Sequence, residues 1–429
     1  MSGLGVFSHL VPLTVQASLF NLVWTRDDYF QKPLIRWARI SLLPITLGMM
    51  FSELVNLKYQ AQLSSHTKLC IGSVITSQAM KSVLFTFKQP ASSSPIKTKD
   101  HPAPQPPSFL STLTNVISLV LASSSDPSKR EISGTGTNHS IHSDMMFLSK
   151  TFRRLLVHHI CGIIALACWR GVNDEALIDQ LAVGPMIKKF KYEITAFCCG
   201  NIIWTNMDLF GCLLRLFWFT SKMINRLLLK LLPSAFKNLP LSEKLNQIDL
   251  EETSPPLFKK TPLEATSMTD FWGRHWHQMI RSLVVEAGAV PVTSLLVWVF
   301  GTGKLHPKVL RLAGVLAAFT ISGLVHEAGV WTAGPIDLTF KTTIFFISQG
   351  VAICLENVFK QAFGRKVDGL LGRIWTFSWL VYFGIPMVTL WLNTSLFDQT
   401  GLFQKVDELG LLRMSLMPLI VPKLLSHSL

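Results

Sequence analysis

Long apolar stretches alternate with short charged ones along this chain, and the alternation predicts its architecture. Nine stretches of 15 to 23 residues are nearly free of charge, close to the length that a helix needs to cross roughly 30 Å of hydrocarbon. Because lipid offers backbone amides no hydrogen-bond partner, each stretch is expected to be helical. The predicted spans are Val6–Trp24, Ile40–Leu57, Leu69–Phe87, Leu155–Trp169, Ala196–Trp218, Leu283–Val299, Val309–Trp331, Phe340–Phe359 and Ile374–Leu392.

A tenth stretch, Leu411–Leu425, is shorter and interrupted by charge and proline, so it either crosses the membrane or lies in its interface. The first stretch is expected to remain as a span, because Met1–Leu10 has no basic segment and no A-x-A cleavage site follows it. The sequence therefore predicts an all-α, polytopic membrane protein with eight to ten transmembrane helices.

Two polar segments interrupt the predicted spans. Residues 88–150 are rich in proline and serine and cannot bury enough apolar surface to become ordered, so a flexible loop is expected. Within it, Phe109–Leu121 is apolar but short, as in an interfacial helix. Residues 221–282 begin with a basic amphipathic run and are expected to form a cytosolic or interfacial segment. The remaining helices then fall into N-terminal (1–87), central (151–220) and C-terminal (283–429) groups.

Charge is scarce and mostly basic. Only 15% of the residues are charged, against about 25% in soluble domains, which excludes a soluble enzyme. The 40 Lys and Arg exceed the 26 Asp and Glu and give a net charge of +14. They flank the apolar stretches, so a positive-inside topology explains them better than nucleic-acid binding does; attraction of an anionic cosubstrate is a weaker alternative. With nine spans, the basic loop 360–373 falls on the non-cytosolic side, so either one late span is miscounted or this loop dips back into the protein.

Candidate chemistry begins with His326, because a histidine inside a membrane span is costly to place. It lies deep in the span Val309–Trp331, and Glu327 follows it. Their side chains point about 100° apart on a helix, which predicts that this face meets protein or a wet cavity and not lipid. Gly323 and Gly329 leave room for a neighbouring backbone or for substrate. The structural alternative is a histidine that hydrogen-bonds a neighbouring helix.

A second cluster, Asp270–Arg281, contains two tryptophans, two histidines and two arginines just before a span begins. On a helix, Gly273, His277 and Arg281 would share one face, while His275 would point nearly opposite to His277. The missing side chain of Gly273 would leave space beside His277. An aromatic belt at the membrane interface accounts for the tryptophans but not for His277.

Other chemistries lack their motifs. None of the 12 histidines begins an H-x-x-x-D, and the chain has no G-x-S-x-G elbow, no P-loop and no H-E-x-x-H. The seven cysteines form no C-x-x-C and are expected to be reduced thiols in apolar spans. No metal is expected, because the usual ligand spacing is missing among His275, His277, His326 and Glu327.

The aromatic–histidine motif Phe271–His277 (Phe-Trp-Gly-Arg-His-Trp-His) and the later intramembrane histidine motif Ser322–Glu327 (Ser-Gly-Leu-Val-His-Glu) resemble, as a pair, the wax synthase branch of the membrane-bound O-acyltransferases. The resemblance is strong from about Thr261 to Leu392 and rests on hydropathy alone in the N-terminal third. In that branch an arginine is commoner at the position of His275. The resemblance implies a helical-bundle membrane enzyme that moves an acyl group from acyl-CoA to a hydroxyl.

The resemblance also implies roles for individual residues. It makes His326 the base that takes the proton from the alcohol, and His277 a second polar catalytic residue. A neutral imidazole suits proton transfer near neutral pH, and an activated thioester needs no covalent acyl-enzyme. His277 is then expected to orient the thioester or to stabilise the oxyanion. Arg274 and Arg281 either meet coenzyme A phosphates or only set the topology. The expected substrate-binding residues are Trp272, Arg274, Trp276, Arg281 and Glu327.

The residues give less information about which acyl group is transferred and which alcohol accepts it than about the type of reaction. A resemblance to fungal O-acetyltransferases of terpenoid and mixed-terpenoid metabolism favours transfer from acetyl-CoA to a terpenoid-like alcohol. Plant members of the branch instead make wax esters from long-chain acyl-CoA and fatty alcohols. A non-catalytic polytopic protein or transporter is the alternative from another class, although the sequence lacks the paired halves typical of transporters.

The same resemblance sets the expected partners. Acyl-CoA is the cosubstrate and no tightly bound cofactor is expected. The other partners are the bilayer and a lipophilic alcohol, without nucleic acid, and the location is a multi-pass one, in the endoplasmic reticulum. No oligomeric state is predicted.

Overall fold

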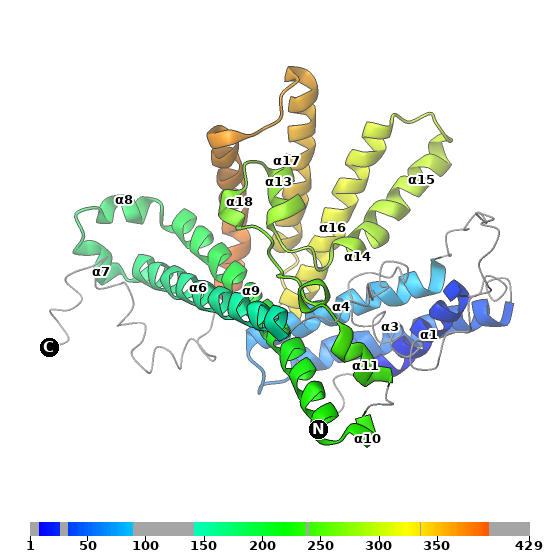
Figure 1. The fold of residues 1–429 in the computed structure, drawn as a ribbon. Helices are drawn as coiled ribbons and strands as arrows, with labels where there is room; N and C mark the ends of the chain where they lie inside the picture. The colour runs from blue at the N-terminus through cyan, green and yellow to red at the C-terminus, as the bar shows by residue number, and fades with distance from the viewer. Residues whose placement is uncertain (1–7, 26–32, 89–140, 237–239, 335, 394–429) are drawn as a thin grey trace. The chain divides into compact units, whose positions relative to one another are not determined.

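Helices account for all the regular structure in the computed structural model over its described residues, 8–25, 33–88, 141–236, 240–334 and 336–393 (Figure 1). The longer helices are α1 Leu10–Thr25, α3 Pro33–Lys58, α4 Ser65–Phe87, α6 Ile141–Asn173, α9 Lys191–Leu231, α15 Val290–Phe300, α16 Pro307–Ala333, α17 Lys341–Phe363 and α18 Gly369–Asn393. The shorter ones are α7 Glu175–Asp179, α8 Gly184–Lys189, α10 Pro233–Phe236, α11 Pro240–Gln247, α12 Leu250–Thr253, η3 Pro262–Glu264, α13 Met268–Asp270, η4 Phe271–His275, α14 Arg281–Val284 and η5 Val285–Ala289.

The all-α polytopic architecture is confirmed. Among the described residues, eight helices are long and apolar enough to cross a membrane, and one of them, residues 281–300, combines α14, η5 and α15. Helix α1, predicted as the first span, is shorter, with its apolar part at Leu10–Leu22. The tenth predicted stretch, Leu411–Leu425, and the predicted interfacial segment Phe109–Leu121 lie outside the described residues.

The chain divides into two compact units. Unit 1 comprises residues 1–131, 279–351 and 394–396, and unit 2 comprises residues 132–278, 352–393 and 397–429. Unit 1 therefore contains α1, α3, α4, α14, η5, α15, α16 and the first half of α17. Unit 2 contains α6 to α13, η3, η4, the second half of α17 and α18. The intramembrane histidine motif lies in unit 1 and the aromatic–histidine motif in unit 2.

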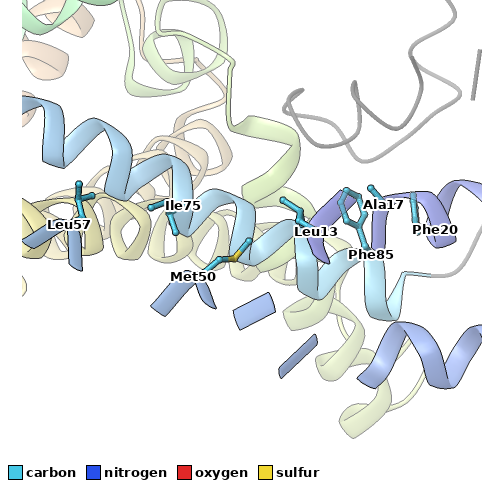
Figure 2. Packing of buried hydrophobic residues seen from close by; sticks show 7 residues of the cluster. All are labelled: Leu13, Ala17, Phe20, Met50, Leu57, Ile75 and Phe85. Carbon is cyan, nitrogen blue, oxygen red and sulfur yellow. The ribbon is translucent and has the colours of Figure 1, made fainter. Parts of the chain in front are cut away.

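Helices α1, α3 and α4 pack around an apolar core in unit 1 (Figure 2). They also bury a polar network, in which the His9 ring lies 2.6 Å from the Glu53 carboxylate and 2.6 Å from the side-chain oxygen of Gln78. Because polar groups in a bilayer are costly unless they are paired, this network is expected to fix how the three helices meet. The apolar core consists of Leu13, Ala17, Phe20, Met50, Leu57, Ile75 and Phe85, each at most 1% exposed.

Helix α16 is packed closely by its neighbours in unit 1. A Cβ atom built at Gly323 would lie 2.8 Å from Thr343 Cα on α17, and one built at Gly329 would lie 2.9 Å from Leu69 O on α4. Of the two predicted uses for these glycines, the approach of a neighbouring backbone is the one that the structure shows. Small residues at helix contacts allow the close packing on which membrane helices depend.

We expect Gly329→Ala to destabilise the protein. The added methyl group would press on Ser73 Oγ and on Leu69 O, and the carbonyl cannot yield unless α4 shifts. Overpacking of this kind costs about 1–3 kcal/mol, so the apparent melting temperature in detergent should fall. The control is Gly48→Ala on α3, where a Cβ meets nothing within 4 Å; it should leave the melting temperature unchanged or slightly higher. Equal melting temperatures for the two variants would contradict this packing.

Helices α6 and α9 lie side by side in unit 2 (Figure 1), and hydrogen bonds from buried charged side chains hold the segment after α9 onto them. The Lys222 side chain is fully buried, and its Nζ lies 3.0 Å from Asp144 Oδ1 and donates to Ile248 O at 2.8 Å. Arg215 donates to Ser254 O at 2.6 Å. Lys222, which belongs to the basic amphipathic run at the start of the predicted cytosolic or interfacial segment, is therefore turned inward, where Asp144 pairs with it.

The ends of these two helices differ from the sequence prediction. Helix α6 begins at Ile141, inside the segment 88–150 that is predicted as a flexible loop, and α9 runs to Leu231, beyond the predicted end of the central helices at residue 220. The Asp144–Lys222 ion pair joins the two extensions and provides the physical reason for them. Residues 89–140 of the predicted loop lie outside the described residues.

Candidate active site

The aromatic–histidine motif lies on a π-helical turn in unit 2. The π-helix η4 ends at His275, and Trp276 is extended, with φ −88° and ψ 155°. The face that Gly273, His277 and Arg281 would share on a helix is therefore not formed, because the helix stops before it reaches His277. π-Helical turns occur frequently at functional sites, since they redirect the side chains that follow.

A buried carboxylate on α17 holds the start of this turn. Glu356 is 7% exposed, and its Oε1 accepts hydrogen bonds from the Met268 N–H at 2.6 Å and from Trp375 Nε1 at 3.1 Å. Its Oε2 accepts from the N–H of Thr269 at 2.9 Å and from the hydroxyl of Thr269 at 2.7 Å. Four donors thus converge on one carboxylate and fix the backbone that leads into the motif. Glu356 was not among the residues predicted from the sequence, although an acidic residue inside the predicted span Phe340–Phe359 was an available signal.

His275 and Arg274 both lie near the Asp270 carboxylate, but His275 is buried and Arg274 is exposed. His275 is 3% exposed, and its Nδ1 donates to Thr261 O at 2.6 Å while its Nε2 lies 3.1 Å from Asp270 Oδ2. The side chain of Arg274 is 71% exposed, with its Nε 3.5 Å from Asp270 Oδ1. Arg274 is therefore accessible to an anionic group, whereas His275, at the position where the resembled branch has arginine, stabilises the inside of the turn.

Aromatic rings pack around His277. Phe271 stacks on Trp276 with ring centroids 5.4 Å apart, and Trp272 meets Trp276 edge to face at 5.8 Å. Phe258 contacts Trp276 at 5.5 Å and the His277 ring at 6.0 Å, both edge to face. The two tryptophans therefore belong to a packed cluster within unit 2, and this cluster positions the half-buried His277 ring. Tryptophans that only marked the membrane interface would not need to pack against His277.

The α17–α18 loop secures the segment before the motif. Thr266 and the Gly369 N–H both hydrogen-bond the Asp368 carboxylate, and these bonds hold the pKa of Asp368 below its usual value. A Cβ built at Gly372 would also collide with Thr266 O, so α18 approaches this segment too closely for a side chain. Both contacts fix the segment that precedes η4.

The intramembrane histidine motif lies on α16 in unit 1. His326 is half-buried, and its ring is parallel to that of Phe346 on α17, with centroids 4.6 Å apart and an interplanar angle of 2°. Neither of its ring nitrogens forms a hydrogen bond to any residue that the structure describes. One face of the ring is thus held by packing while the nitrogens are unbonded, which suits a proton acceptor and argues against a histidine that bonds a neighbouring helix.

Glu327 joins α16 to the first turn of α17. It is 1% exposed, and its Oε2 accepts hydrogen bonds from the Thr343 N–H at 2.9 Å and from the Thr343 hydroxyl at 3.0 Å. Its Oε1 has no hydrogen-bond partner among the described residues. The bonds to Thr343 are structural, so the predicted part of Glu327 in substrate binding stays a prediction that depends on its second oxygen.

Arg281, predicted to bind substrate, is the exposed first residue of α14. No group of three or more His, Cys, Asp or Glu in the described part of the chain is arranged to hold a metal ion. The predicted site residues divide between the units, with Arg281, His326 and Glu327 in unit 1 and Trp272, Arg274, Trp276 and His277 in unit 2.

Residues 254–348 match the sequence model of the membrane bound O-acyl transferase family. Among similar proteins, the probable long-chain-alcohol O-fatty-acyltransferase 2 of Arabidopsis thaliana is 33% identical over 135 residues, 30% of this chain and 38% of the relative. The long-chain-alcohol O-fatty-acyltransferase of Simmondsia chinensis is 36% identical over 107 residues, 25% of this chain and 29% of the relative. The acyl-CoA–sterol O-acyltransferase 1 of Arabidopsis thaliana is 27% identical over 167 residues, 38% of this chain and 44% of the relative.

These aligned segments span less than half the length of each relative. No solved structure matches the chain. The family match contains both the aromatic–histidine motif and the intramembrane histidine motif, so the part of the chain that carries the candidate chemistry is the part that is similar to membrane-bound O-acyltransferases.

Proposed function

We propose that this protein is a membrane O-acyltransferase that moves an acyl group from acyl-CoA to the hydroxyl of a lipophilic alcohol. The observation that supports it best is that one family match, residues 254–348, contains both motifs. The unbonded ring nitrogens of His326 add independent support. The proposal includes acyl-CoA as cosubstrate, no tightly bound cofactor, and a multi-pass location in the endoplasmic reticulum membrane.

In the proposed reaction, His326 takes the hydroxyl proton as the alcohol oxygen attacks the thioester carbonyl carbon. A carbon–oxygen bond forms, the carbon–sulfur bond breaks, and the electron pair leaves with the coenzyme A thiolate, which then receives the proton from His326. His277 donates a hydrogen bond to the carbonyl oxygen as negative charge develops on it. The exposed guanidinium of Arg274 contacts a phosphate of coenzyme A.

The donor and the acceptor are the finer part of the proposal. The resemblance to fungal O-acetyltransferases predicts acetyl-CoA and a terpenoid alcohol, and this stays a prediction. The relatives named above are called long-chain-alcohol O-fatty-acyltransferases and a sterol O-acyltransferase. Their names favour, as a second candidate, a long-chain acyl donor with a fatty alcohol or a sterol as acceptor.

The test is an assay on membranes that contain the full-length protein. Radiolabelled acetyl-CoA or palmitoyl-CoA is supplied with 1-hexadecanol, a sterol or a terpenoid alcohol, and the labelled ester is separated by thin-layer chromatography. We expect ester formation that depends on the protein, and the donor that supports it decides between the two candidates. Absence of ester with every pair would overturn the proposal and favour a transporter or a non-catalytic protein.

We expect His277→Ala to lower the transfer rate on the order of 10²-fold, because a hydrogen-bond donor to the developing oxyanion is lost. His277→Asn should recover part of the rate, since an amide still donates from this position. Initial rates at saturating acyl-CoA measure both effects. A full rate in the alanine variant would remove His277 from the reaction and leave it as part of the aromatic cluster.

A further inference from the structure

A second intramembrane histidine, which the proposed reaction does not use, lies on α6 in unit 2. His158 is 8% exposed, and its Nε2 lies 3.1 Å from Asp208 Oδ2 on α9, a residue that is 1% exposed. Arg154, on the same face of α6, donates to that carboxylate through Nε at 2.5 Å and through Nη2 at 2.8 Å. Ionisable groups inside a span are rare and costly, and their presence points to a function.

The charges of this triad balance when His158 is neutral. Arg154 and Asp208 form a two-bonded ion pair, so the carboxylate is already neutralised. A carboxylate only accepts hydrogen bonds, so His158 Nε2 carries the proton and His158 Nδ1 presents a lone pair. A protonated imidazole would add an uncompensated charge to an apolar region. The triad therefore fixes His158 as a hydrogen-bond acceptor.

Two polar atoms on neighbouring rings lack partners here. His158 Nδ1 and Trp204 Nε1 are both buried, and neither forms a hydrogen bond to any described residue. The two rings meet edge to face, with centroids 5.1 Å apart and an interplanar angle of 85°. One atom accepts and the other donates. Because buried polar groups are nearly always satisfied, this pair indicates a ligand that supplies both partners.

A hydroxyl group has the required chemistry, since it donates to His158 Nδ1 and accepts from Trp204 Nε1. A carboxylate or phosphate has no proton for His158 Nδ1, and Arg154 is already engaged by Asp208. The same two helices bury an apolar cluster of Ala165, Leu166 and Ile202. The surroundings therefore select a neutral, lipophilic molecule that carries a hydroxyl.

This cluster adjoins the aromatic–histidine motif. Trp204 lies edge-on to Phe258 with centroids 6.5 Å apart, and Phe258 contacts the His277 ring. Arg154 Nη2 also donates to Phe258 O at 2.5 Å. Arg154, which pairs with Asp208, thus also holds the backbone of Phe258, whose ring contacts the His277 ring.

We propose that His158 Nδ1 and Trp204 Nε1 form a binding site for the hydroxyl of a neutral lipophilic alcohol, with Asp208 and Arg154 as the positioning residues of His158. That this alcohol is the acyl acceptor rests on the proposed function, whereas its binding does not.

The experiment measures equilibrium binding of tritiated 1-hexadecanol and of a tritiated sterol to the full-length protein in lipid nanodiscs. Unlabelled 1-hexadecanol is expected to compete with its tritiated form, while hexadecyl methyl ether, which accepts but does not donate a hydrogen bond, should compete about tenfold less well. His158→Phe and Trp204→Phe should each weaken binding about tenfold. Trp204→Phe keeps a packed ring and removes the N–H, so it tests the site even if His158→Phe fails to fold. The matched control is His159→Gln on α6, which should bind as the wild type does.

Failure of both probes to bind, or equal affinity in the wild type and both phenylalanine variants, overturns the site. A buried water would then be the hydrogen-bond partner of His158 Nδ1 and Trp204 Nε1. Failure of the proposed function can be distinguished from failure of this binding site. A protein that binds hexadecanol through these residues but forms no ester with any donor retains the site and loses the reaction. Ester formation with an unchanged KM for the alcohol in both variants retains the reaction and overturns the assignment of this site to the acyl acceptor.

Discussion

Replacing His326 by alanine or by phenylalanine is expected to lower acyl transfer by roughly 10²- to 10⁴-fold, the range that a general base contributes. Both variants should still fold, because His326 forms no hydrogen bond to any described residue and its known contact is the stack on Phe346. His326→Phe retains that stack and removes both ring nitrogens, so it separates proton transfer from packing. Initial rates and size-exclusion profiles in detergent measure the two properties.

The control for these variants is His306→Asn at the start of the same helix. His306 is exposed and caps α16 by accepting from the Lys308 N–H at 3.2 Å, and asparagine caps helices equally well. Its transfer rate should equal that of the wild type. A normal rate in His326→Phe would remove the base from the proposal, and aggregation of that variant would show that the imidazole is needed for structure.

Hydropathy predicted the spans because the thickness of the bilayer sets the length of a helix that crosses it. The stretch Val309–Trp331 differs from α16, Pro307–Ala333, by two residues at each end. The same physics identified His326, since a polar residue in a span is conspicuous against its apolar neighbours. Local composition was sufficient for both predictions.

Contacts between residues that are far apart in the sequence could not be predicted from local composition. Glu356 binds the backbone of Met268, which lies 88 positions earlier in the chain, and no periodic pattern connects two such residues. The aromatic–histidine motif was considered only as an ordinary helix, because a π-helical turn leaves no trace in a hydrophobic period. Lys222 belongs to the basic amphipathic run of the predicted cytosolic or interfacial segment, and its partner Asp144 lies in a segment predicted to be a flexible loop, so the sequence did not connect the two.

Glu356→Gln is expected to lower both the stability and the activity of the protein. The amide of glutamine has the volume of the carboxylate, but its NH₂ group donates hydrogen bonds and cannot accept them. That NH₂ group would face the N–H donors of Met268, Thr269 or Trp375. Leaving such buried donors unpaired should reduce the free energy of unfolding by about 3 kcal/mol. Because Glu356 fixes the turn that carries the aromatic–histidine motif, a small displacement of His277 should also lower the transfer rate, on the order of 10²-fold.

The transfer rate of Glu356→Gln is measured as the specific activity of the monodisperse fraction, well below its melting temperature. Loss of folded protein then does not contribute to the measured rate. The matched control is Glu264→Gln in η3, which removes a charge from an exposed glutamate on the same segment and should change neither property. A lower melting temperature with full specific activity would make Glu356 a purely structural residue. Three of the four bonds to Glu356 come from Met268 and Thr269, and Thr269 lies only one residue before Asp270. Because η4 begins directly after Asp270, a shift of this backbone cannot be absorbed before the motif starts, which is why we expect both properties to fall together.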